Sequence, residues 1–164
     1  MRARAFSLVE LVIVVVIIGV VAAIAVPRVT TASRQAKANA LEATMASIRE
    51  AMELYYADHR KYPGYNPSTG APVNANFPLQ LTRYTDEAGN TSTTFGAPFI
   101  YGPYLREPFP ANPINGLRTV YVKATPASPS LIGGTGWLAA LSTGDFEPNV
   151  SAGELEAFGI QALP

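Results

Sequence analysis

The hydrophobic and polar positions divide the chain into a uniformly apolar first region and a patterned second one. Residues 11–26 form an unbroken apolar run without a charged side chain, and Pro27 follows it. Counted from Phe6, the apolar segment has Ser7 and Glu10 as its only polar members. A helix of about 20 residues spans about 30 Å, the thickness of the hydrocarbon core of a bilayer. The pattern therefore predicts a helix long enough to cross a membrane.

Glu10 is the unusual member of this segment. A charged side chain costs about 2.5–3.5 kcal/mol at the centre of a bilayer and less toward its faces. Glu10 lies near the N-terminal end of the segment, so its cost is smaller, but a plain anchor has no use for it. An ionisable residue inside a membrane helix indicates a function and calls for a positively charged partner.

The apolar pattern changes after Pro27. Apolar residues there recur at alternating spacings of four and three, which places them on one face of a helix: Leu41, Met45, Ile48, Met52 and Tyr55. We expect residues 28–59 to continue the first helix and to bury this stripe against a sheet. The sequence Tyr62-Pro63-Gly64 predicts that the helix ends near residues 58–60. Arg49 and Glu53, four residues apart, are expected to form an ion pair on the helix surface.

The rest of the chain reads as loops and short strands. Residues 63–98 are rich in Pro, Gly, Asn and Thr and predict an irregular connection, with one short helical turn at 77–81. Residues 117–123 and 136–141 predict two strands, which we expect to pair as an antiparallel hairpin across a loose loop. A turn at 143–145 and a short helix in the tail from Ser151 follow. The predicted fold class is α+β, with a long N-terminal helix packed on a small antiparallel sheet.

Composition narrows the possible functions. Twelve basic and twelve acidic residues give a net charge of zero, so the chain offers no basic field for nucleic acid. It has no cysteine, which excludes disulfides. Its single histidine, His59, lies at the predicted helix end between Asp58 and Arg60, where we expect it to be solvated. Since no catalytic set is recognisable, the sequence does not predict an enzyme.

The N-terminal residues together form a recognisable signal. Arg2 and Arg4 are followed by the small residue Ala5, by Phe6-Ser-Leu-Val-Glu10, by the apolar run and by Pro27. This order resembles the class III signal of prepilins of the type IV pilus and type II secretion families, and the end of the run, residues 22–27, is similar to that of the major pseudopilins. The resemblance implies that a prepilin peptidase cleaves between Ala5 and Phe6 and that the new amine of Phe6 is methylated. The family prefers glycine before the cut, whereas this chain has alanine.

The same resemblance implies an organisation and a function. It divides the chain into a leader (1–5), a transmembrane and filament-core helix (6–27) and an extracytoplasmic pilin-like domain (28–164). The expected function is that of a structural subunit of a type II secretion pseudopilus, held in the inner membrane and then assembled into a helical filament. The expected partners are other copies of the chain, minor pseudopilins, the prepilin peptidase and an inner-membrane assembly platform.

Individual residues acquire roles from the resemblance. Glu10 would pair with the Phe6 amine of a neighbouring subunit and set its axial register, and the alternative is a contact within the subunit. Gly19 and Pro27 match the two positions between which the pilin helix can loosen in a filament. Major pseudopilins also bind calcium in their C-terminal loops, where this chain has Asp145 and Glu147, with Asn149 beside them; the alternative is that these are ordinary surface turn residues. No other cofactor is expected.

Two alternatives remain open. The chain could be a type IV pilus subunit for adhesion, motility or DNA uptake. It could also be a secreted or anchored binding domain with an ordinary signal peptide, in which Ala23-Ile24-Ala25 would be the cleavage site. Glu10 inside the apolar run and the helical pattern beyond Ala25 argue against an ordinary signal. The mass of the mature chain separates the two cases, since a pilin starts at Phe6 and a secreted protein near Val26.

Overall fold

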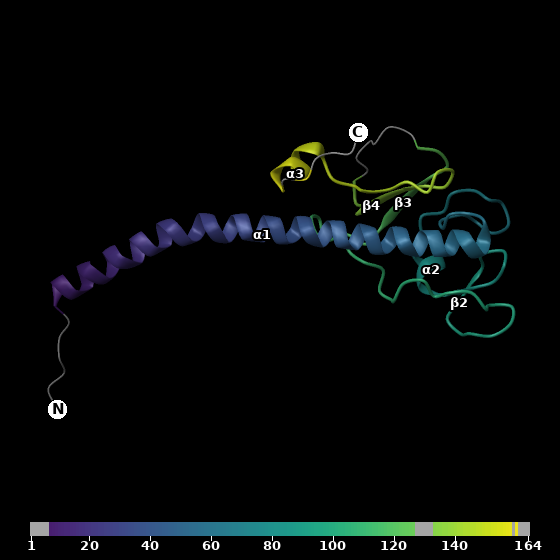
Figure 1. Cartoon of the computed structure of the whole chain (residues 1–164), viewed down its shortest axis with the longest axis horizontal. Helices are drawn as coiled ribbons and strands as arrows, with labels where there is room; N and C mark the ends of the chain where they lie inside the picture. Colours follow the sequence, from purple (N-terminus) through teal and green to yellow (C-terminus); the bar gives the residue numbers. More distant parts are fainter. Residues whose placement is uncertain (1–6, 127–132, 159, 161–164) are drawn as a thin grey trace, which may run out of the picture. The chain divides into compact units, whose positions relative to one another are not determined.

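The computed structural model describes residues 7–126, 133–158 and 160. It separates into two compact units, Met1–Ala36 and Lys37–Pro164. The first helix, α1 (Leu8–His59), has 52 residues and contributes to both units (Figure 1). It continues through Gly19 and Pro27 without a break in its helical assignment. The prediction that residues 28–59 extend the apolar helix is confirmed.

The end of α1 lies where the turn signals predicted it. The N–H of Arg60 donates to the Tyr56 carbonyl at 2.8 Å, and Arg60 then takes a positive φ of 58°. A residue in the left-handed region commonly terminates a helix. Pro63, three residues later, cannot continue a helical hydrogen-bond ladder.

The second half of α1 supplies one wall of the core of the second unit. All five residues of the predicted stripe are buried, together with Ala38 and Ala51 on the same helix. They pack against large side chains from the rest of the unit, of which the most central are Phe77, Leu81, Trp137 and Phe146. The amphipathic pattern of residues 41–55 therefore reports correctly which face of α1 is covered.

A three-stranded sheet forms the opposite wall. It contains β3 (Val120–Lys123), β4 (Trp137–Ala140) and β5 (Phe146–Pro148), in the order β3-β4-β5. In Figure 1, β3 and β4 lie on one side of the second half of α1, and α2 and β2 lie on the other. The unit thus has the predicted α+β class, with the helix packed against a small sheet.

The predicted hairpin between β3 and β4 is wrong. The two strands pair in parallel, with Val120 opposite Trp137 and Lys123 opposite Ala140. Residues 124–136 between them are numerous enough to return the chain to the starting end of β3, which a parallel pair requires. The antiparallel hairpin is instead β4 with β5, closed by the predicted turn, in which the Gly144 N–H donates to the Ala140 carbonyl at 3.0 Å.

The connection after α1 contains more structure than its composition predicted. The expected helical turn is present as α2 (Asn76–Thr82), and the strands β1 (Tyr84–Thr85) and β2 (Thr91–Ser92) form a small antiparallel pair that the sequence did not indicate. The buried amide of Gln80 ties these segments together. Its Oε1 accepts from the Gly64 N–H at 2.7 Å, and its Nε2 donates to the carbonyls of Tyr65 and Gly89.

The predicted tail helix is α3 (Ala152–Ala157). Ser151 accepts a hydrogen bond from the Glu154 N–H and Glu154 accepts one from the Ser151 N–H, which is a complete capping box. The ammonium group of Lys37 lies 5.8 Å from the centre of the Phe158 ring, and Leu155 and Ile160 pack on the core. The tail therefore belongs to the same unit as the second half of α1.

The burial of the stripe gives a test with an internal control. In a fragment that begins at Arg28, we expect Ile48→Ala to lower the free energy of unfolding by about 2–5 kcal/mol, because it removes a fully buried side chain from the core. Leu54→Ala on the same helix should change it by less than about 0.5 kcal/mol, because Leu54 is 53% exposed. Urea unfolding of the three proteins measures both values. Equal losses for the two variants would show that the stripe is not the buried face.

Candidate functional site

The first turn of α1 carries the one acidic residue of the apolar segment. The N–H of Ser7, directly before the helix, donates to Glu10 Oε2 at 3.1 Å. The Leu11 N–H donates to the Ser7 carbonyl at 3.2 Å and opens the helical ladder. Ser7 and Glu10 thus occupy the N-cap and N3 positions, in which a Glu side chain satisfies the N–H that precedes a helix. A negative charge in this turn also interacts favourably with the helix dipole.

Glu10 therefore has a partner within its own chain. The alternative to pairing with a neighbouring subunit is a contact within the subunit. The contact present here is of that kind, and its donor is the Ser7 N–H. The signal for it is present in the sequence, since Ser7-Leu-Val-Glu10 is the S-x-x-E pattern that precedes an apolar helix. The cleavage residues Ala5 and Phe6 lie outside the described residues, so their predicted roles stay predictions.

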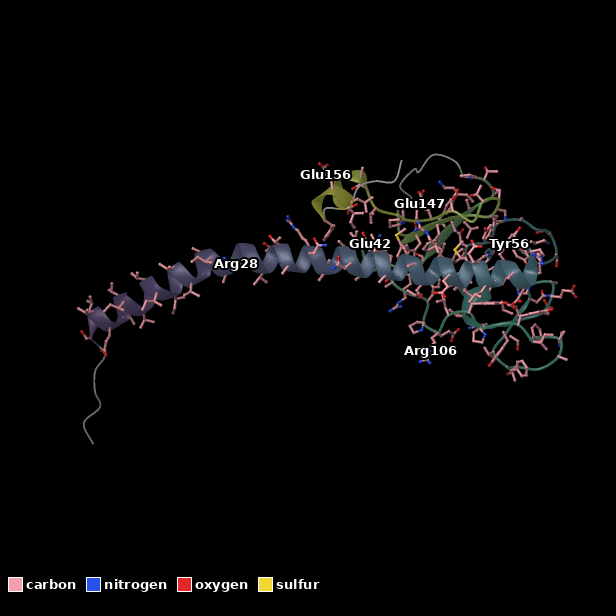
Figure 2. The ribbon with its side chains drawn as sticks, in the orientation of Figure 1. Arg28, Glu42, Tyr56, Arg106, Glu147 and Glu156 are labelled. Carbon is pink, nitrogen blue, oxygen red and sulfur yellow. The ribbon has the colours of Figure 1, made fainter. Side chains whose placement is uncertain are left out.

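The segment that follows is an apolar surface without cover in the described part of the chain. The large hydrophobic side chains from Leu8 to Ile24 are between 49% and 77% exposed. Figure 2 shows side chains standing out along both sides of this part of α1. A Cβ atom added at Gly19 would meet nothing within 4 Å, so this position is open to close approach by another helix. By length and composition, α1 is a helix that could cross a membrane; a signal sequence meets the same criterion.

Comparison with known proteins agrees with this geometry. The prokaryotic N-terminal methylation motif matches residues 1–26. The start of the chain therefore carries the motif of prepilins, and the chain resembles the type IV pilin-like class of proteins. Its fold, a long apolar helix packed at its far half on small sheets, is the α+β arrangement expected of that class.

Particular relatives come from both branches of that class. The type IV narrow pilus major component PilA5 of Thermus thermophilus is 51% identical over 54 residues, which are 33% of this chain and 47% of that protein. The type II secretion system core protein G of Pseudomonas aeruginosa is 38% identical over 58 residues, 35% of this chain and 41% of that protein. The fimbrial protein of Neisseria meningitidis is 31% identical over 72 residues, 44% and 42% of the two chains.

These matches are partial on both sides. The chain spans less than half the length of each of these three relatives. No solved structure matches the chain. The similarity thus covers part of the protein, and the roles of the relatives reach this chain only as proposals.

The predicted calcium residues lie along β5 and its ends. The hydroxyl of Thr143 donates to Asp145 Oδ2 at 2.6 Å, and Asn149 donates through its Nδ2 to the Thr135 carbonyl at 3.0 Å. Among the described residues, no group of three or more His, Cys, Asp or Glu side chains could hold a metal ion. Calcium also takes carbonyl oxygens, so the assignment of Asp145 and Glu147 stays a prediction.

Two predictions for the end of α1 are wrong. Arg49 does not pair with Glu53: its Nη2 donates to the Phe146 carbonyl of β5 at 2.8 Å, and Glu53 accepts from the Tyr62 hydroxyl at 3.2 Å. His59 is not solvated, since only 7% of it is exposed. Segments distant in the sequence cover it: its ring lies 4.1 Å from that of Tyr55 and 5.2 Å from that of Tyr101.

Both ring nitrogens of His59 have partners. Nδ1 lies 3.4 Å from the Glu87 carbonyl, which can only accept, so Nδ1 carries the proton of the neutral ring. Nε2 lies 3.0 Å from the Thr85 hydroxyl, which then donates to it. The Tyr104 hydroxyl, 3.3 Å from Nε2, donates to Asp58 Oδ2 at 2.7 Å. The neutral imidazole thus fastens the end of α1 to β1 and to the segment around Tyr104.

This environment sets the pKa of His59. Burial removes water from the charged form and lowers the pKa below its ordinary value of about 6.5, while the Glu87 carbonyl, Asp58 and Asp86 oppose the shift less strongly. Burial and the hydrogen bond to Tyr65 raise the pKa of Tyr55, so this phenol also stays neutral. The cluster is therefore built for an uncharged histidine.

A pH dependence of stability follows. The unfolded chain takes up a proton at His59 below about pH 6.5, and the folded chain takes it up only at lower pH. The stabilisation by His59 is thus complete above about pH 6.5 and is lost as the pH falls toward the folded pKa, with a slope of at most about 1.4 kcal/mol per pH unit. Urea unfolding of the Arg28 fragment at about pH 7.5 and at about pH 5.5 measures this loss of stability. His59→Gln should remove this part of the slope, and identical slopes would show that His59 is not the group that titrates.

Proposed function

We propose that the chain is a structural subunit of a type II secretion pseudopilus. A prepilin peptidase would cleave it between Ala5 and Phe6 and methylate Phe6, and the mature chain would lie in the inner membrane with residues 28–164 outside. The observation that carries the proposal is the exposed apolar surface from Leu8 to Ile24, which lies within the residues that match the methylation motif. Such a surface has to be covered, first by lipid and then by the same helix of other copies.

A type IV pilus subunit is the second candidate. It is favoured by the 51% identity to the narrow pilus component over 54 residues, a third of the chain. Three relatives named type II secretion system core protein G favour the first candidate. In both cases filament self-assembly is the common function. We propose minor pseudopilins, the peptidase and an inner-membrane assembly platform as further partners, and Asp145 with Glu147 as a calcium site.

Glu10 would act in assembly by exchanging its partner. In the single chain its carboxylate accepts from the Ser7 N–H, a neutral donor. Cleavage creates a positively charged amine on Phe6, and the same group on a neighbouring copy is a stronger partner for a carboxylate in a medium of low dielectric constant. The pair forms only when the two helices are in one axial register. The cap also explains how Glu10 is accommodated before assembly.

Two substitutions separate these roles. Glu10→Gln keeps an oxygen that can accept from the Ser7 N–H but removes the charge, whereas Glu10→Val removes both. We expect both variants to be inserted and cleaved, because a charge leaves the lipid phase. We expect both to lower the yield of sheared filaments roughly tenfold or more, which corresponds to ~1.4 kcal/mol of lost contact.

Glu42→Gln, which alters an exposed acid beyond the apolar segment, is the control and should assemble normally. If Glu10→Gln assembles like the wild type and only Glu10→Val fails, the helix cap is the essential contact. If both variants assemble at the normal rate, Glu10 does not set the register.

A further inference from the structure

Basic residues follow the apolar segment without any acid to balance them. Arg28, Arg34 and Lys37 come directly after it, and no Asp or Glu occurs between Glu10 and Glu42. Arg28, labelled in Figure 2, and Arg34 are exposed on α1. Neither guanidinium forms an ion pair within the described residues. The ion pair found there joins Arg83 and Glu107. These arginines therefore form a positive surface that no acidic side chain among the described residues neutralises.

The depth of this surface follows from the helix. The polar, capped first turn places Glu10 at one face of the hydrocarbon core. Because α1 is helical throughout, Arg28 lies ~27 Å further along the axis and Arg34 ~36 Å. The hydrocarbon core is about 30 Å thick and each headgroup layer adds about 5–7 Å. Arg28 thus lies within one helical turn of the opposite boundary, from which a long side chain reaches outward, and Arg34 lies in the headgroup layer itself.

We propose that Arg28 and Arg34 bind the anionic phospholipid headgroups of the leaflet at the outer end of the span. A guanidinium group donates two parallel hydrogen bonds to a phosphate, and anionic lipids attract basic residues beside a span. The inference rests on the proposed membrane insertion and extends it. Removal of residues 1–5 would also remove Arg2 and Arg4, so the outer arginines become the main basic anchor of the mature span. Extraction into a filament would then have to break these lipid contacts.

Acidic side chains of a neighbouring copy are the alternative partner for Arg28 and Arg34. In a filament, acids of a neighbouring copy could neutralise the same arginines. The lipid is favoured for the unassembled subunit, because its headgroups surround the helix at the depth of Arg34 whereas no acid of the chain occurs between Glu10 and Glu42. A single subunit in a bilayer distinguishes the two partners, because only lipid binding gives it a preference for anionic headgroups.

Lipid selectivity of the full mature chain tests the proposal. The chain is placed in nanodiscs of phosphatidylcholine, and the association of spin-labelled phosphatidylglycerol is compared with that of spin-labelled phosphatidylcholine. We expect the anionic label to be preferred, by up to roughly fivefold for each arginine at headgroup depth. The preference should fall to near one in Arg28→Gln/Arg34→Gln, and high salt should weaken it in the wild type.

Arg60→Gln/Arg106→Gln is the matched control, because both residues are exposed arginines outside the apolar segment. It should keep the wild-type selectivity. Equal association of both labels with the wild type, or an unchanged preference in Arg28→Gln/Arg34→Gln, would overturn the proposal. If Arg28→Gln/Arg34→Gln kept its lipid preference but no longer formed filaments, the partner of the arginines would be an acid of a neighbouring copy. The measurement needs insertion but no filament, so it is independent of the assembly role of Glu10.

Discussion

The structure depends on how the apolar surface at the start of α1 is covered. The side chains from Leu8 to Ile24 are exposed, and none of this span is buried within the described chain. Water is the least favourable environment for such a surface, at roughly 25 cal/mol for each Å² exposed. In the proposed function, a lipid bilayer and then the same helix of other copies cover this surface. The capped Glu10 and the arginines after the span define the ends of this surface.

The second unit uses the remainder of the same helix as its scaffold. The stripe from Leu41 to Tyr55 is buried against the sheet and α2, and His59 fastens the helix end to β1. Side chains also occupy backbone groups of the two outer strands: Arg49 donates to the Phe146 carbonyl of β5, and Asn74 accepts from the Val122 N–H of β3. Occupied edges disfavour strand addition. The sheet edges are thus less suited than the apolar part of α1 to the contacts between copies that we propose.

Periodicity predicted the helices well. The extent of α1, its buried stripe, α2 and α3 all follow from local spacing and turn residues, which act over a few positions. The direction of β4 relative to β3 does not, because it depends on the path of the loop between them. The burial of His59 was missed for a related reason: its neighbours in sequence are charged, whereas its cover comes from Thr85, Tyr101 and Tyr104. The Ser7–Glu10 cap is a local contact, and the S-x-x-E pattern of residues 7–10 encodes it.

In the proposed function, the apolar half of α1 is retained in the mature protein as a filament-forming helix. The intact mass of the protein isolated from membranes and from sheared filaments tests it most directly. We expect a chain that begins at Phe6 and carries one additional methyl group. A chain that begins near Val26 would contradict it, because the apolar helix would then be a signal that is discarded.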